Sequence, residues 1–143
     1  MARVELNFPE QFYFTTTLTV RFTDLNVGSH VGNDQMIALL SEARSRFLYH
    51  FGIEVWQEKG LNLLVTDLMA TYKQSAFGHD ILRFDVGVMD FNKYGGDIIF
   101  RVTRPATDDL IVLAKTGFVL INVLTSKIAP LPKEFRDIFP DAF

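Results

Sequence analysis

The segment from Asn33 to Gly52 constrains the fold of this chain most, because its pattern predicts one long helix in a sequence otherwise composed of strands. Apolar residues recur there at steps of three and four, at Met36, Leu40, Ala43, Phe47 and Phe51, and Ile37, Leu39 and Leu48 widen the stripe. A helix with so broad an apolar face is mostly buried. We expect Asn33 as its N-cap, since the side-chain oxygen can accept from a free amide of the first turn. Gly52 is expected to end the helix in the left-handed conformation.

The segments around this helix alternate between apolar and polar residues with a period of two, which is typical of strands. Such patterns occupy residues 12–22 before the helix and 61–74, 81–91 and 97–104 after it, and 110–124 is apolar on both faces, as in a central strand. We interpret Tyr94-Gly95-Gly96 as a turn, and expect a last short helix over 133–139, between Pro132 and Pro140. This order predicts an α+β domain with one long helix against one antiparallel sheet.

The composition excludes several classes of protein. A length of 143 residues predicts a single domain over 1–143. The chain has no cysteine, which excludes disulfides, thiolate zinc sites and cysteine nucleophiles, and its histidines at 30, 50 and 79 are too far apart to suggest a metal centre. A net charge of -3 offers no basic surface to nucleic acid.

Hydrophobicity gives two further expectations. No apolar run has the length of a signal-peptide core or a membrane span, so we expect a cytoplasmic protein that does not enter membranes. Hydrophobic residues nevertheless make up 48% of the chain, which is high for a small monomer. We therefore expect a second copy of the chain to cover part of the surface.

The densest polar cluster of the sequence lies in residues 21–34, immediately before the long helix. Backbone amides at a helix N-terminus have no partner within the helix, so they can hold an anion or a developing oxyanion. Gly32 would let a substrate approach the backbone closely there. From these residues alone, the segment is a candidate oxyanion site.

The same segment resembles the signature of the hotdog-fold acyl-CoA thioesterases, the group that includes 4-hydroxybenzoyl-CoA thioesterase. That signature is approximately Arg-[Tyr/Phe]-x-Asp-x-Asp-x-x-Gly-His-Val-Asn-Asn, followed by a helix containing Glu-Glu-Ala-Arg. The matching stretches here are Arg21-Phe22-Thr23-Asp24-Leu25-Asn26, His30-Val31-Gly32-Asn33, Ser41-Glu42-Ala43-Arg44, residues 72–82 and Pro130-Leu131-Pro132. They cover nearly the whole chain in the order of the family.

The resemblance implies a sheet wrapped around the long helix and a homo-oligomer, a dimer or a tetramer, in which two sheets join edge to edge. An acyl-CoA would bind in a tunnel at the subunit interface, with coenzyme A as part of the substrate and with no separate cofactor and no metal. The family's oxyanion contact, a backbone amide at the helix start, corresponds to Asn33. The family's catalytic aspartate corresponds to Asn26.

This departure changes the expected chemistry, because an amide can neither accept a proton nor attack a thioester at neutral pH. A carboxylate would then have to come from Asp24, Asp34 or Glu42, and His30 is the other candidate base, since an imidazole changes protonation near neutral pH. Our prediction is that Asn26 and His30 orient water or the thioester, with a carboxylate from Asp24 or Glu42 nearby.

Each of these residues also has a purely structural interpretation. Asp24, Asn26 and His30 can close the loop through bonds to the backbone. Glu42 can pair with Arg46 one helical turn away. The alternatives remain open at the level of the sequence.

For the phosphates of coenzyme A, the candidates by charge are Lys73, Arg83 and Lys93, although solvated surface charge explains them as well. The leading hypothesis is thus an acyl-CoA thioesterase. A hotdog protein that binds acyl thioesters without hydrolysing them is the alternative that Asn26 supports. A hydratase or dehydratase on the same fold ranks last, because His30 lies in the thioesterase-type loop.

Overall fold

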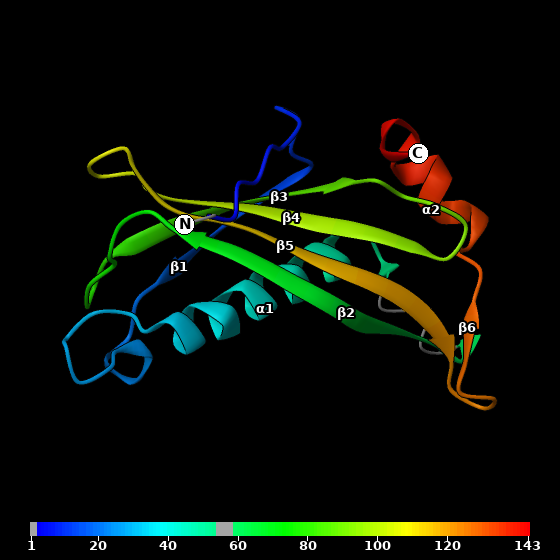
Figure 1. The fold of residues 1–143 in the computed structure, drawn as a ribbon, viewed down its shortest axis with the longest axis horizontal. Helices are drawn as coiled ribbons and strands as arrows, with labels where there is room; N and C mark the ends of the chain where they lie inside the picture. Colours follow the sequence, from blue (N-terminus) through cyan, green and yellow to red (C-terminus); the bar gives the residue numbers. More distant parts are fainter. Residues whose placement is uncertain (1–2, 54–58) are drawn as a thin grey trace.

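The structure is a computed structural model that describes residues 3–53 and 59–143, and in these residues a six-stranded antiparallel sheet lies across one long helix (Figure 1). The spatial order of the strands is β1-β3-β4-β5-β2, and β6 pairs with the end of β5. The strands are β1 (Phe14–Thr19), β2 (Leu61–Tyr72), β3 (Ile81–Met89), β4 (Gly95–Arg104), β5 (Asp109–Asn122) and β6 (Lys127–Ala129). The predicted α+β architecture, with one long helix against one antiparallel sheet, is confirmed.

The long helix α1 (Asn33–His50) buries the predicted stripe, and its fully covered positions are Met36, Leu39, Leu40, Ala43 and Phe47. Gly52 follows the helix with φ +70°, as predicted for its end. The predicted N-cap is wrong by one residue: Gly32 is the N-cap, and Asn33 is the first helical residue. The shift arises because Val31 N–H is already fixed to the Ala76 carbonyl at 2.9 Å, so the chain turns into the helix at Gly32.

The core lies between α1 and the inner face of the sheet, and at one end it consists almost entirely of phenylalanine. Phe47 of α1 stacks on Phe139 at 5.7 Å, and Phe91 meets Phe118 edge-on at 5.6 Å. The predicted last helix is present as α2 (Lys133–Ile138), and a 3-10 turn follows it at Pro140–Ala142. Figure 1 shows α2 at the opposite end of the sheet from the start of α1.

Two features near β4 differ from the sequence prediction. Gly95 and Gly96 belong to the strand rather than to a turn. A Cβ on Gly95 would lie 1.8 Å from the Phe118 carbonyl oxygen, so the two strands approach too closely for any side chain there. The short strand β6 was not predicted, because three residues carry too little alternation to be recognised.

The strand β2 forms one edge of the sheet, and α1 does not cover the inner face of this strand. Val65, Leu68 and Tyr72 lie opposite Phe118, Thr116 and Val112 of β5, which are buried on the inner face. The three β2 side chains are nevertheless 40%, 37% and 47% exposed. An apolar stripe is therefore uncovered along β2. Within the described residues, no helix has the length and apolarity that spanning a bilayer would demand.

Candidate active site at the start of the long helix

The loop before α1 is held in a closed turn by its own backbone. Asn26 N–H donates to the His30 carbonyl at 2.9 Å, and Ser29 N–H donates to the Asn26 carbonyl at 3.1 Å. Ser29 adopts a left-handed φ of 64°, which lets the chain reverse within so few residues. A β-bridge between His30 and Phe77 joins this loop to the turn before β3. The loop is therefore fixed in position at the start of the helix.

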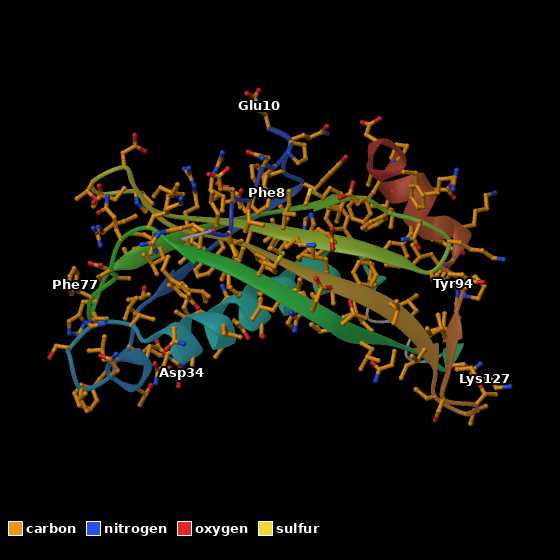
Figure 2. The ribbon with its side chains drawn as sticks, viewed as in Figure 1. Phe8, Glu10, Asp34, Phe77, Tyr94 and Lys127 are labelled. Carbon is orange, nitrogen blue, oxygen red and sulfur yellow. The ribbon has the colours of Figure 1, made fainter. Side chains whose placement is uncertain are left out.

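Three of the predicted site residues lie together. Asn26, His30 and Asn33 line one cleft of about 360 Å³, whose other wall is the end of β2 and the residues that follow it, Tyr72, Lys73, Gln74 and Ser75. Figure 2 shows Asp34 and Phe77 at this same end of the molecule, beside the loop. The fold thus brings a loop, a helix start and a strand end to one place.

The side chain of Asn26 is oriented by its own turn. Its Oδ1 accepts a hydrogen bond from Gly28 N–H at 2.9 Å, while the residue as a whole is exposed. Because Oδ1 is already engaged, the Nδ2 group is the part of the amide that is left for a ligand, and it can only donate. Asn26 therefore presents hydrogen-bond donors to the cleft.

The imidazole of His30 is oriented in a similar way. Its Nδ1 lies 3.3 Å from the Gly28 carbonyl oxygen. A carbonyl oxygen can only accept, so in this contact Nδ1 carries the hydrogen. In the neutral ring with this tautomer, Nε2 is the nitrogen that can accept a proton.

The first turn of α1 has no side-chain cap, since its N-cap is Gly32. The side-chain oxygens of Gln35 and Asp34 lie beside this glycine, where an added Cβ would meet them at 2.0 and 2.9 Å. The Tyr72 hydroxyl donates to the Asn33 carbonyl at 3.0 Å and ties this turn to β2. Burial, and to a lesser degree the nearby Asp34 carboxylate, raises the pKa of the Tyr72 hydroxyl, which therefore stays a donor. Tyr72 was not among the predicted site residues, although the stretch that contains it resembled the family signature.

The two carboxylates predicted for the site, Asp24 and Glu42, lie elsewhere in the protomer. Both line a separate cavity of about 650 Å³, which β1 and the opposite side of α1 enclose. Glu42 is nine residues from Asn33, or about two and a half helical turns, and therefore points to the opposite side of α1. The expected proximity of either carboxylate to Asn26 and His30 is not found within one protomer.

Both carboxylates have structural partners. Asp24 is buried, and its carboxylate accepts a hydrogen bond from the Arg21 backbone N–H at 2.8 Å. It also forms an ion pair with the Arg21 guanidinium at 3.1 Å. These hydrogen bonds hold the pKa of the Asp24 carboxyl below its usual value. Glu42 pairs with Arg46 at 3.1 Å.

The three cations predicted for coenzyme A are dispersed. Lys73 lines the cleft. Arg83 lies on β3 with its Nε 3.5 Å from Asp85, and the Lys93 ammonium lies 5.4 Å from the Tyr94 ring, in a cavity beside α2. Only Lys73 therefore reaches the cleft within one protomer.

Comparison with known proteins identifies the family and the fold. The sequence model of the thioesterase-like superfamily matches residues 20–139. No curated protein matches the chain.

Several solved structures share the fold. The probable thioesterase YbaW from Escherichia coli has 23% identity and a TM-score of 0.80, with 91% of this chain and 98% of that chain covered. The 1,4-dihydroxy-2-naphthoyl-CoA thioesterase Slr0204 from Synechocystis has 18% identity and a TM-score of 0.80, with coverage of 90% and 96%. SAV2348 from Staphylococcus aureus, in complex with CoA, has 17% identity and a TM-score of 0.82, with coverage of 95% and 86%. The expected hotdog fold is confirmed by these similarities.

Proposed function

The chain belongs to the thioesterase-like superfamily, and on this premise we propose that it hydrolyses the thioester bond of an acyl-CoA. The observation that carries the proposal is the cleft at the start of α1, which Asn26, His30 and Asn33, the first residue of the helix, line together. A thioester carbonyl placed there would have donors on one side and a base on the other.

The oxyanion is stabilised by two donors. The Asn33 backbone amide belongs to an uncapped helix start, where the helix dipole also favours negative charge. The Nδ2 group of Asn26 supplies the second donor, because its Oδ1 is held by Gly28. Donors fixed before the substrate arrives stabilise developing charge at little cost of reorganisation.

His30 is the general base in this proposal. Its Nε2 takes a proton from water as the water oxygen bonds to the thioester carbon, and the Gly28 carbonyl holds the Nδ1 hydrogen in place. When the tetrahedral intermediate collapses, the carbon–sulfur bond breaks and the proton passes to the departing sulfur. The products are a free carboxylic acid and coenzyme A, which together contain all atoms of the acyl-CoA and water.

Coenzyme A is proposed to lie across the outer rim of the cleft, with Lys73 beside a phosphate. Arg83 and Lys93 both lie outside the cleft of their own protomer. They are therefore candidates only for phosphate contacts at the cleft of a second protomer. Support for this substrate class comes from SAV2348, a protein of the same fold that was solved with CoA. Because acyl-CoA is an intracellular metabolite, we also propose a cytoplasmic place of action.

A homo-oligomer joined through β2 is part of the proposal. One edge of β2 pairs with β5, and the opposite edge has no strand beside it in the described residues. An exposed edge bearing Leu64, Val65 and Leu68 tends to pair with another strand. A dimer, alone or within a tetramer, would extend the sheet across this edge and close the open face of β2.

One observation favours a second candidate, a protein that binds acyl thioesters without cleaving them. Among the described residues that line the cleft, none is an aspartate or a glutamate. If His30 cannot act as the base, the same donors would hold the thioester without hydrolysis.

The test is release of free thiol from a panel of acyl-CoAs. We expect His30→Ala and Asn26→Ala each to lower kcat by about a hundredfold or more, since each removes one proposed catalytic group. Asn26→Asp keeps an acceptor for Gly28 but replaces the donor by a charge, and is expected to lower kcat as well. The matched control is His50→Gln, at the exposed far end of α1. Thiol release that neither alanine variant changes would contradict the proposed site.

A further inference from the structure

Arg44, in the middle of α1, is a half-buried cation for which the described part of the chain supplies no carboxylate partner. Its guanidinium donates to Ser41 Oγ at 3.5 Å, a long hydrogen bond. Burial lowers the pKa of the Arg44 guanidinium. Five other arginines are paired with aspartate or glutamate, namely Arg21, Arg46, Arg83, Arg101 and Arg104. Among the described residues, no carboxylate therefore occupies the place beside Arg44 that an anionic ligand would take.

A pocket of about 290 Å³ lies beside Arg44, between α1 and the start of β2. Its apolar wall comes from the helix, β2 and β5, while Ser41, Ser45 and Asn62 add polar groups to the lining. None of the described residues that line it is acidic. A cation at the end of an apolar pocket is suited to a ligand that is apolar along its length and anionic at its tip.

This pocket lies on the same side of α1 as the cleft. Asn33 and Arg44 are eleven residues apart, which is about three full turns and about 16 Å along the helix. Between the two, Tyr72, Leu68 and Val65 of β2 present the uncovered apolar stripe described above. An acyl chain whose thioester lies at Asn33 thus has an apolar path that leads to Arg44.

We infer that Arg44 binds a carboxylate at the far end of the acyl group, so that the preferred substrates are acyl-CoAs with a terminal carboxylate. This inference rests on the proposed function and specifies its substrate class. The span of about 16 Å corresponds to an acyl chain of roughly a dozen carbons, because an extended chain advances about 1.2 Å per bond. The carboxylate supplies the charge partner that Arg44 lacks, and Ser41, Ser45 or Asn62 completes its hydrogen bonds.

A phosphate of coenzyme A fits this position less well. The pocket is smaller than the usual site for a whole drug-sized ligand, so it suits a terminal group rather than a nucleotide. A phosphate in this pocket would lose water to the apolar wall. At the open rim of the cleft, Lys73 can bind a phosphate that keeps its water.

The experiment compares acyl-CoAs of equal chain length with and without a terminal carboxylate. The wild-type protein is expected to prefer the carboxylated member in kcat/KM, most strongly near twelve carbons. Arg44→Met should lower this preference by about tenfold to a hundredfold, the range expected when a charge-assisted hydrogen bond is lost, and leave turnover of the plain acyl-CoA within about threefold. Arg44→Lys should retain part of the preference. The control is Arg46→Met, on the same helix, whose guanidinium is already paired with Glu42.

Three outcomes separate this inference from the proposed function. Equal turnover of both acyl-CoAs by the wild-type protein overturns the inference and leaves the thioesterase function intact. An unchanged preference in Arg44→Met, together with loss of the oligomer, makes Arg44 an interface residue and also overturns it. If no acyl-CoA is hydrolysed, the proposed function fails, and binding of non-hydrolysable thioether analogues still decides the inference. Tighter binding of the carboxylated analogue that depends on Arg44 supports the inference, and equal binding rejects it.

Discussion

Asn26 and Asp24 are two positions apart in one loop, yet their surroundings differ completely. The Asn26 side chain is exposed at the cleft and turned by Gly28 so that its Nδ2 group faces outward. The Asp24 carboxylate is buried and satisfied by Arg21. At the scale of single residues, the loop therefore separates the group that can contact a substrate from the group that maintains the loop.

Asp24 should make the stability of the protein sensitive to acid. Its hydrogen bonds with Arg21 place the folded-state pKa of the carboxyl below the usual value of 3.8, so the unfolded chain binds the proton more readily. The stabilisation is fully present above about pH 4 and is lost as the pH falls through the folded-state pKa. We expect Asp24→Ala to cost about 1 to 3 kcal/mol at pH 7 and to flatten this acid dependence. Urea unfolding at pH 7 and pH 3 measures both effects, and an unchanged slope with pH would contradict the assignment.

At the scale of elements, the close pairing of β4 with β5 depends on Gly95. We expect Gly95→Ala to destabilise the fold by about 2 kcal/mol or more, because the added Cβ would meet the Phe118 carbonyl oxygen and backbone would have to move. Gly78→Ala is the matched control, since its Cβ would meet Leu25 at an ordinary 3.4 Å. Thermal unfolding should show a lower Tm for the first variant and a nearly unchanged Tm for the second. Equal Tm values would show that the paired strands adjust to a side chain at Gly95.

The helix and the long strands could be predicted because each repeats its pattern over many residues. The stripe of Met36, Ala43 and Phe47 and the alternation in β3 are produced by the same burial that the structure shows. The start of α1 and the extent of β4 depend instead on long-range contacts, such as Val31 with Ala76, that no local pattern contains.

The site was predictable to the same degree. Asn26, His30 and Asn33 are close in sequence and stay close in space. Glu42 is also near in sequence, but the turn of the helix carries it to the opposite side of α1. Tyr72 reaches the site only through the packing of β2 on the helix start. Arg44 stands out only in the structure, where it is half-buried and the described residues provide no carboxylate beside it.

At the scale of the whole molecule, the open edge and face of β2 are best explained by a second copy of the chain. We expect the wild-type protein to exceed its monomer mass of 16.3 kDa in solution. Leu68→Asp would bring an unpaired charge into the buried contact and should shift the protein towards the monomer. Leu124→Asp, at the exposed turn between β5 and β6, is the control. Light scattering that shows a wild-type monomer would contradict the proposed interface.

The central claim is that the cleft at the start of α1 hydrolyses acyl-CoA through His30 and amide donors, with no aspartate or glutamate among the described residues that line it. The measurement that tests it most directly is thiol release and equilibrium binding of the same acyl-CoA by the wild-type protein and by His30→Ala. The account predicts that both proteins bind with Kd values within about threefold, and that only the wild type sustains thiol release, at least about a hundredfold faster. Binding by the wild type without thiol release, or equal release by His30→Ala, would contradict it.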